Sequence, residues 1–105
     1  MRRRTVYKHS VPHDEVMREA LANDPEFARA CINLALEDGD MDDVLDILRQ
    51  LALTNGGMAE LAKKTGLHEK SLYKTLSRQG NPLFSTVLTI MSALGVRLVA
   101  EAKSA

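Results

Sequence analysis

The segment 57–78 holds the residues whose types and spacing could carry recognition chemistry. Its apolar spacing predicts two short helices, at about 57–64 and 68–78, joined by a turn. Two such helices cross closely at a steep angle when they share a core. The crossing requires a small residue in the first helix, which Ala62 supplies, and a residue that tolerates positive φ in the turn, which Gly66 supplies. The segment is therefore predicted to be a helix-turn-helix.

The second of these helices is predicted to carry a basic outward face. Four leucines suit the shared core of the two helices: Leu61, Leu67, Leu72 and Leu76. The positions that remain outward are Glu69, Lys70, Ser71, Lys74 and Arg78. Such side chains reach base edges and phosphates when a helix lies in the major groove of DNA. The basic ones could also be solvated surface charges, but the motif around them favours contact with DNA.

Three polar side chains in or near this helix allow two interpretations each. Glu69 could accept a hydrogen bond from a cytosine amino group, or it could be a first-turn acid stabilised by the helix dipole. Tyr73 could lean on a phosphate or pack against the protein. Asn81, in a Gln-Gly-Asn-Pro loop, could donate to a phosphate or serve the turn alone.

Amphipathic helices are predicted on both sides of this segment. A short apolar stripe at 16–21 comes first, and Asp24-Pro25 then starts a helix, with Asp24 as the N-cap and Pro25 at the first helical position. The apolar residues that follow are spaced i, i+3, i+4 and i+7, which predicts one buried face. That face would consist of Phe27, Ala30, Cys31 and Leu34.

Further breaks and caps divide the rest of the chain. Gly39 is expected to end one helix and Asp40 to cap the next, which runs to the Asn55-Gly56-Gly57 break. A last helix is expected around 87–94, and the tail 96–102 is rich in β-branched residues, which predicts a short strand. The predicted fold is all-α, with about six helices and this C-terminal strand.

The predicted strand would need a partner, because a lone strand is not stable. Its apolar residues Val96, Leu98 and Val99 are therefore candidates for dimerisation. A length of 105 residues, 45% of them hydrophobic, predicts one domain at 12–105, preceded by a flexible basic arm at 1–11. No apolar run suits a membrane span or a signal peptide, and the single cysteine fits a reducing cytosol, so we expect a cytoplasmic protein.

The net charge of zero conceals a segregated distribution. Residues 1–9 carry +4, residues 10–60 carry −9 and residues 61–105 carry +5. An acidic surface of this kind is repelled by DNA and suits a basic protein. The candidate partner-binding residues are Glu37, Asp38, Asp40, Asp42, Asp43 and Asp46. The alternative is that these acids only cap helices and keep the protein soluble.

These motifs resemble a known family. The run GGMAELAKKTGLHEKSLYKTLSRQGNPLFSTVLTIMSALGVRL is similar to the DNA-binding region of the Cro and phage-repressor (XRE) superfamily. Together with the upstream DPEFARACINLALEDGD, it resembles the narrower addiction-module antidotes, the HigA-like antitoxins encoded beside RelE/HigB-type toxins. The likeness covers roughly residues 15–99. It implies a phage-repressor-like helical bundle in a homodimeric repressor that binds operator DNA, controls its own operon and pairs with a small basic toxin.

The resemblance also assigns two further candidate DNA contacts, Met58 and His68, which lie where the two motif helices begin. The chain departs from the pattern at both places. Gly57-Met58 replaces a Thr-Gln pair, and His68 replaces a Ser, Thr or Asn cap. An alternative interpretation is a protein-binding adaptor that keeps the helical bundle but no longer binds DNA.

Other chemistries lack the residues they need. The acidic run 37–43 does not fit a calcium loop, because the sixth position is Asp43 rather than Gly and the twelfth is Arg49 rather than Glu. The three histidines have no metal-ligand spacing, and no nucleophile–base set or phosphate-binding glycine loop is recognisable. We therefore expect neither an enzyme nor a cofactor.

Overall fold

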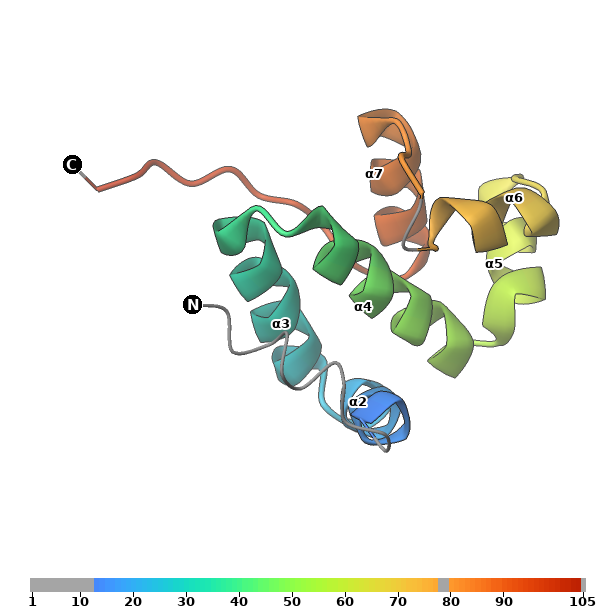
Figure 1. The fold of residues 1–105 in the computed structure, drawn as a ribbon, viewed down its shortest axis with the longest axis horizontal. Helices are drawn as coiled ribbons and strands as arrows, with labels where there is room; N and C mark the ends of the chain where they lie inside the picture. The colour runs from blue at the N-terminus through green and yellow to red at the C-terminus, as the bar shows by residue number, and fades with distance from the viewer. Residues whose placement is uncertain (1–12, 78–79, 105) are drawn as a thin grey trace.

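The computed structural model describes residues 13–77 and 80–104, and it is all-helical over these ranges (Figure 1). The predicted series of six helices is confirmed there. Among the described residues, no helix is long and apolar enough to cross a membrane. The helices are α2 (His13–Asn23), α3 (Pro25–Asp38), α4 (Met41–Thr54), α5 (Gly57–Thr65), α6 (Glu69–Thr75) and α7 (Phe84–Ala93).

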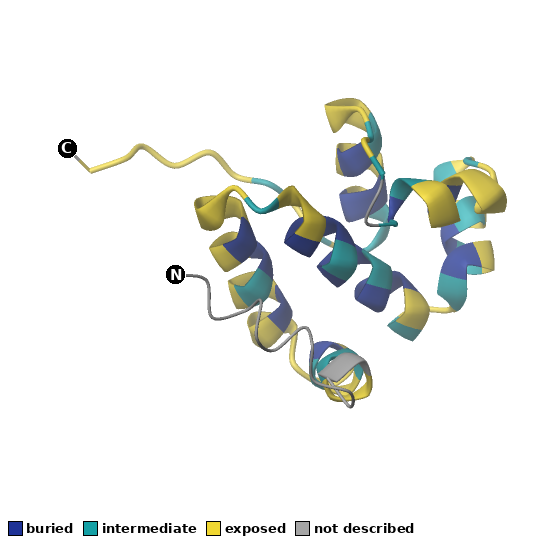
Figure 2. Cartoon of the chain, viewed as in Figure 1, coloured by how far each residue is buried: buried dark blue, intermediate teal, exposed yellow. Residues whose placement is uncertain are grey.

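Helix α4 is the centre of the fold. It packs against α2 and α3 on one side and against α5 on the other, and α5 in turn packs against α6 and α7 (Figure 1). Buried residues follow α4 along most of its length and continue onto the inner faces of its neighbours (Figure 2). The buried amide of Gln50 on α4 accepts a hydrogen bond of 3.0 Å from Nε of Arg18 on α2, so its carbonyl oxygen is satisfied. One continuous core therefore connects the two ends of the molecule.

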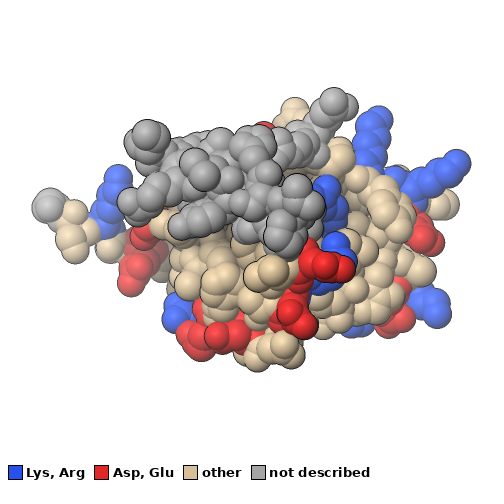
Figure 3. Space-filling model, turned by 60° about the horizontal axis from the view of Figure 1, so that its bottom comes forward, with Lys and Arg blue, Asp and Glu red and all other residues tan. Residues whose placement is uncertain are grey.

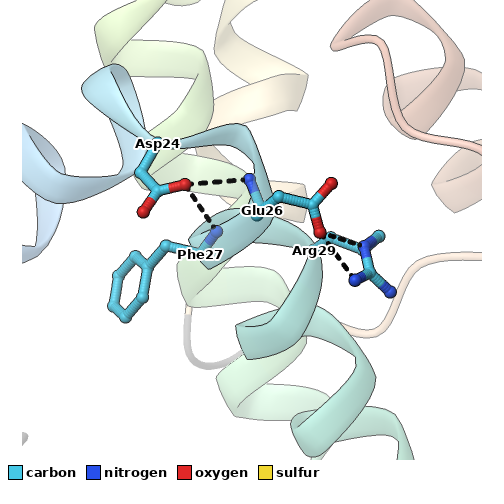
Figure 4. A network of polar contacts seen from close by, with 4 residues as sticks. All are labelled: Asp24, Glu26, Phe27 and Arg29. Carbon is cyan, nitrogen blue, oxygen red and sulfur yellow. Dashed lines mark hydrogen bonds and ion pairs between the residues drawn. The ribbon is translucent and has the colours of Figure 1, made fainter.

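Local capping chemistry explains the boundaries of α3 and α4. Asp24 Oδ1 accepts the backbone N–H groups of Glu26 and Phe27 at 3.1 and 3.2 Å, at the start of α3 (Figure 4). Gly39 ends α3 in the left-handed region, with a φ of 67° that favours glycine. Asp40 Oδ1 then accepts the N–H of Asp43 at 3.1 Å to cap α4. These predicted caps and breaks are confirmed.

The predicted buried face of α3 is wrong except at Cys31, which is half-buried and packs against the core. Phe27 and Leu34 are 36% and 46% exposed, whereas Ala28, Ile32 and Ala35 are 7%, 3% and 0% exposed. The helix has two apolar stripes, and the spacing of each is helical. The buried stripe carries two alanines, and short side chains let a helix approach its neighbours closely. The stripe with the larger side chains is left outside.

The predicted C-terminal strand is also wrong. No strand occurs among the described residues, and 96–104 continue without regular structure, leading away from the helices (Figure 1). The Val96 N–H donates to the carbonyl of Met91 at 2.8 Å, which ties the start of this tail to the end of α7. Val96 and Leu98 pack partly against the core, while Val99 is 72% exposed. Composition favoured a strand, but the described part of the chain offers no second strand for pairing.

Candidate functional site

Helices α5 and α6 are joined by a tight turn, as the sequence predicted. Gly66 has a φ of 77°, and its N–H donates to the Ala62 carbonyl at 2.8 Å. The hydroxyl of Thr65 donates to the Leu61 carbonyl at 2.9 Å and accepts the N–H of Leu67 at 3.2 Å. The turn therefore satisfies the backbone at the end of α5 before α6 begins at Glu69.

The predicted core side of this helix pair is confirmed. Leu61, Leu72 and Leu76 are each at most 2% exposed, and Leu67 and Ala62 pack against the core while partly buried. Burying a leucine side chain stabilises the fold by about 1.5–3 kcal/mol. This contact fixes which side of α6 faces outward.

The predicted outward residues of α6 lie together on the surface. In a helix, Lys70 and Lys74 are one turn apart, and both point away from the side that Leu72 buries. His68, at the N-cap, makes no side-chain capping hydrogen bond. The residues that are exposed here are His68, Glu69, Lys70, Ser71, Tyr73 and Lys74.

The structure adds two basic residues to this surface. Lys63 and Lys64 are exposed in the last turn of α5, directly before the turn to α6. Basic side chains at a helix C-terminus are also favoured by the helix dipole. The sequence could have indicated them, since both lie inside the motif, but attention to the second helix alone missed them. We call the surface made of Lys63, Lys64, Lys70 and Lys74 the basic end.

Two other predicted contacts lie elsewhere, and a third is not among the described residues. Met58 is 2% exposed and belongs to the core, because α5 begins with that side chain turned inward, so we leave it out of the surface. Asn81 is exposed in the loop before α7. Helix α6 ends at Thr75, earlier than predicted, and Ser77 Oγ donates to the Lys74 carbonyl at 2.7 Å beyond that end. Arg78 and the basic arm 1–11 lie outside the described residues.

The six predicted partner-binding acids divide into two groups. Asp40 caps α4, Asp43 is only 5% exposed, and Asp46 pairs with Arg49 on the same helix. These three therefore serve the scaffold of α4. The exposed acids are Glu37, Asp38 and Asp42.

Charged side chains of both signs are spread over the surface of the molecule. In Figure 3, long basic side chains project on the right, the side on which α5 and α6 lie in Figure 1, with acidic side chains among them, and further acidic side chains gather along the lower edge. Among the described residues, no group of His, Cys, Asp or Glu could hold a metal ion.

The fold and these surfaces define a small all-helical protein with the basic end on α5 and α6 and exposed acids on α3 and α4. Residues 15–102 match the family described as "Probable addiction module antidote protein". The chain belongs to this antidote family. Because an antidote acts by binding a toxin, membership implies a toxin partner.

A relative from Haemophilus influenzae is 33% identical over 66 residues. The match covers 63% of this chain and 67% of the relative, which is described only as an uncharacterized protein. No solved structure matches the chain.

Proposed function

We propose that the chain is the HigA-like antitoxin of a type II toxin–antitoxin module, and that it represses its own operon by binding DNA and neutralises a RelE/HigB-type toxin. The observation that carries the DNA-binding part is the arrangement of α5 and α6. The buried leucines fix one side of α6, and Lys70 and Lys74 occupy the opposite side. Membership of the antidote family supports the toxin-binding part.

In this proposal α5 and α6 form a phage-repressor-type helix-turn-helix, and α6 enters the major groove. Lys70 lies near the N-terminal end of α6 and approaches a base edge, and Lys74 reaches a base or a phosphate one turn later. Lys63 and Lys64 add phosphate contacts that position the helix without reading sequence. Each phosphate contact releases counterions, so binding weakens as salt rises.

Specific binding in this proposal requires two copies of the chain. A single motif of this size contacts only a few base pairs, and a two-fold dimer reads two half-sites about 10 bp apart. We assign the dimer contact to the tail, where Val96 and Leu98 are partly buried and Val99 is exposed. Each tail supplies apolar surface that a second copy could cover.

Fluorescence anisotropy with labelled DNA from upstream of the chain's own reading frame tests the proposal. The double variant Lys70→Ala/Lys74→Ala should bind at least about tenfold more weakly, because each specific contact contributes about 1–3 kcal/mol. Arg29→Ala removes an exposed base from α3, far from the basic end, and is the matched control. Equal affinity of the double variant and the wild type would contradict the assignment of α6. No binding by the wild type would favour the adaptor alternative.

A further inference from the structure

Helix α3 carries an apolar face that the rest of the described chain does not cover. Its members share one side of the helix, since they are spaced i, i+3, i+4 and i+7. We call this face the α3 stripe, and it consists of Phe27, Ala30, Cys31 and Leu34. Cys31 is half-buried and packs against the core, and the other three are exposed. Because α3 meets the core through Ala28, Ile32 and Ala35, the large side chains of Phe27 and Leu34 remain exposed.

The backbone that carries the aromatic member of the stripe is anchored. The N–H of Phe27 donates to Asp24 Oδ1 in the cap of α3, so the backbone beneath the ring is anchored. Figure 4 shows the ring projecting away from the helix, on the other side from the ion pair between Glu26 and Arg29. An exposed aromatic side chain on a rigid helix loses little conformational entropy on binding, which is typical of interface anchors.

Acidic side chains follow the C-terminal end of the stripe along the chain. Glu37 and Asp38 are exposed in the last turn of α3, where the structure has no basic residue, and Asp42 is exposed at the start of α4. The helix dipole favours bases, not acids, at a C-terminus, so the dipole does not account for these two acids. Their charge instead suits a basic partner.

We propose that the α3 stripe is the docking face for a basic amphipathic helix of the toxin. The stripe spans seven helical steps, or about 10 Å, which matches two turns of a helix that docks through i, i+3, i+4 and i+7 anchors. Phe27 and Leu34 contact the apolar side of the toxin helix, and Glu37 and Asp42 meet its Lys or Arg side chains. This assignment rests on the proposed function, which supplies the toxin as partner.

The charges argue against two other occupants. DNA is repelled by the acids beside the stripe, and residues 10–60 together carry −9. A second copy of the chain would present the same net negative segment, which does not complement the acids beside the stripe. A basic protein has neither of these electrostatic disadvantages.

Titration of the purified toxin from the adjacent reading frame onto the full chain tests the proposal. Phe27→Ala and Leu34→Ala should each raise the Kd by about tenfold or more, as expected for interface anchors. Phe84→Ala removes an equally large ring from the start of α7, where it is 67% exposed, and should leave the Kd unchanged. Operator binding by all three variants should equal that of the wild type.

The other outcomes are distinguishable. Tight toxin binding that ignores Phe27→Ala and Leu34→Ala would overturn the docking proposal and leave the proposed function standing. No toxin binding by the wild type would contradict the proposed function itself. A lower oligomer mass in Phe27→Ala would assign the stripe to a second copy, and a loss of thermal stability beyond that of Phe84→Ala would assign it to another segment of this chain.

The acidic residues should act at a different step from the stripe. Rim charges mainly steer the encounter, so Glu37→Gln/Asp42→Asn should slow toxin association several-fold while changing dissociation little. The difference should fade as salt is raised, because salt screens charges at the surface. Stopped-flow mixing at two salt concentrations measures both rates. An association rate equal to that of the wild type at low salt would show that Glu37 and Asp42 do not belong to the toxin-binding surface.

Discussion

Helices α3 and α6 use their apolar residues in opposite ways. On α6 and at its C-cap, the leucines chosen from sequence as core are the buried ones, and Leu72 and Leu76 are at most 1% exposed. On α3, the stripe that the spacing singled out lies outside, with Leu34 46% exposed. The same helical spacing therefore identified the buried side of α6 correctly and the buried side of α3 incorrectly.

The difference shows what helical spacing can decide. Helical spacing identifies the buried side when a helix has only one apolar face, as α6 does. Helix α3 has two apolar faces, and the choice between them depends on how closely its neighbours pack. The alanines of α3 allow that close packing, and its larger side chains remain free for another molecule. An apolar face that is left outside by such a choice is a reason to look for a partner.

The largest effect that we expect comes from removing the tail. Deleting residues 96–105 should lower the oligomer mass in light scattering to that of one chain. It should also weaken operator binding by orders of magnitude, because a single chain contacts only one half-site. If the truncated protein keeps the full-length mass, the tail does not form the dimer.

A second prediction tests the comparison on α3 itself. Ile32→Ala should lower the free energy of unfolding by about 2–5 kcal/mol, since it leaves a cavity in the core. Leu34→Ala should cost less than about 1 kcal/mol, because its side chain is nearly half exposed. Urea denaturation followed by circular dichroism measures both values. Equal losses would mean that the two faces of α3 do not differ as described.

The third and smallest effect that we expect concerns the N-caps of α3 and α6. Asp24→Ala removes an oxygen that accepts two backbone N–H groups, so it should lower the free energy of unfolding by about 1 kcal/mol. His68→Ser should raise it by up to about 1 kcal/mol, because His68 makes no side-chain cap at α6. The same denaturation experiment applies. Destabilisation by His68→Ser would show that the imidazole supports α6 in another way.

The parts of the fold that could be predicted are those fixed by neighbouring residues. Asp24, Asp40, Gly39 and Gly66 act within one helical turn of their own positions, so their caps and breaks follow from local chemistry. The tail depends on a distant pairing partner, and its β-rich composition predicted a strand that does not form.

The candidate site could be predicted only in part. The outward position of Lys70 and Lys74 follows from the leucines beside them, and the structure agrees. The burial of Asp43 and the exposure of Phe27 depend on how α3 and α4 pack, and sequence spacing does not contain that information. Helix packing also places Met58 in the core, although its position in the motif had suggested a contact with DNA.

The central claim is that the two ends of the molecule serve two partners independently. One measurement tests it most directly, namely the Kd values of Lys70→Ala/Lys74→Ala and of Phe27→Ala, each for both operator DNA and toxin. We predict that the lysine variant loses at least about tenfold in affinity for DNA and binds toxin as the wild type does, and that Phe27→Ala shows the reverse. A variant that weakens both partners equally, without a loss of folding, would contradict the claim.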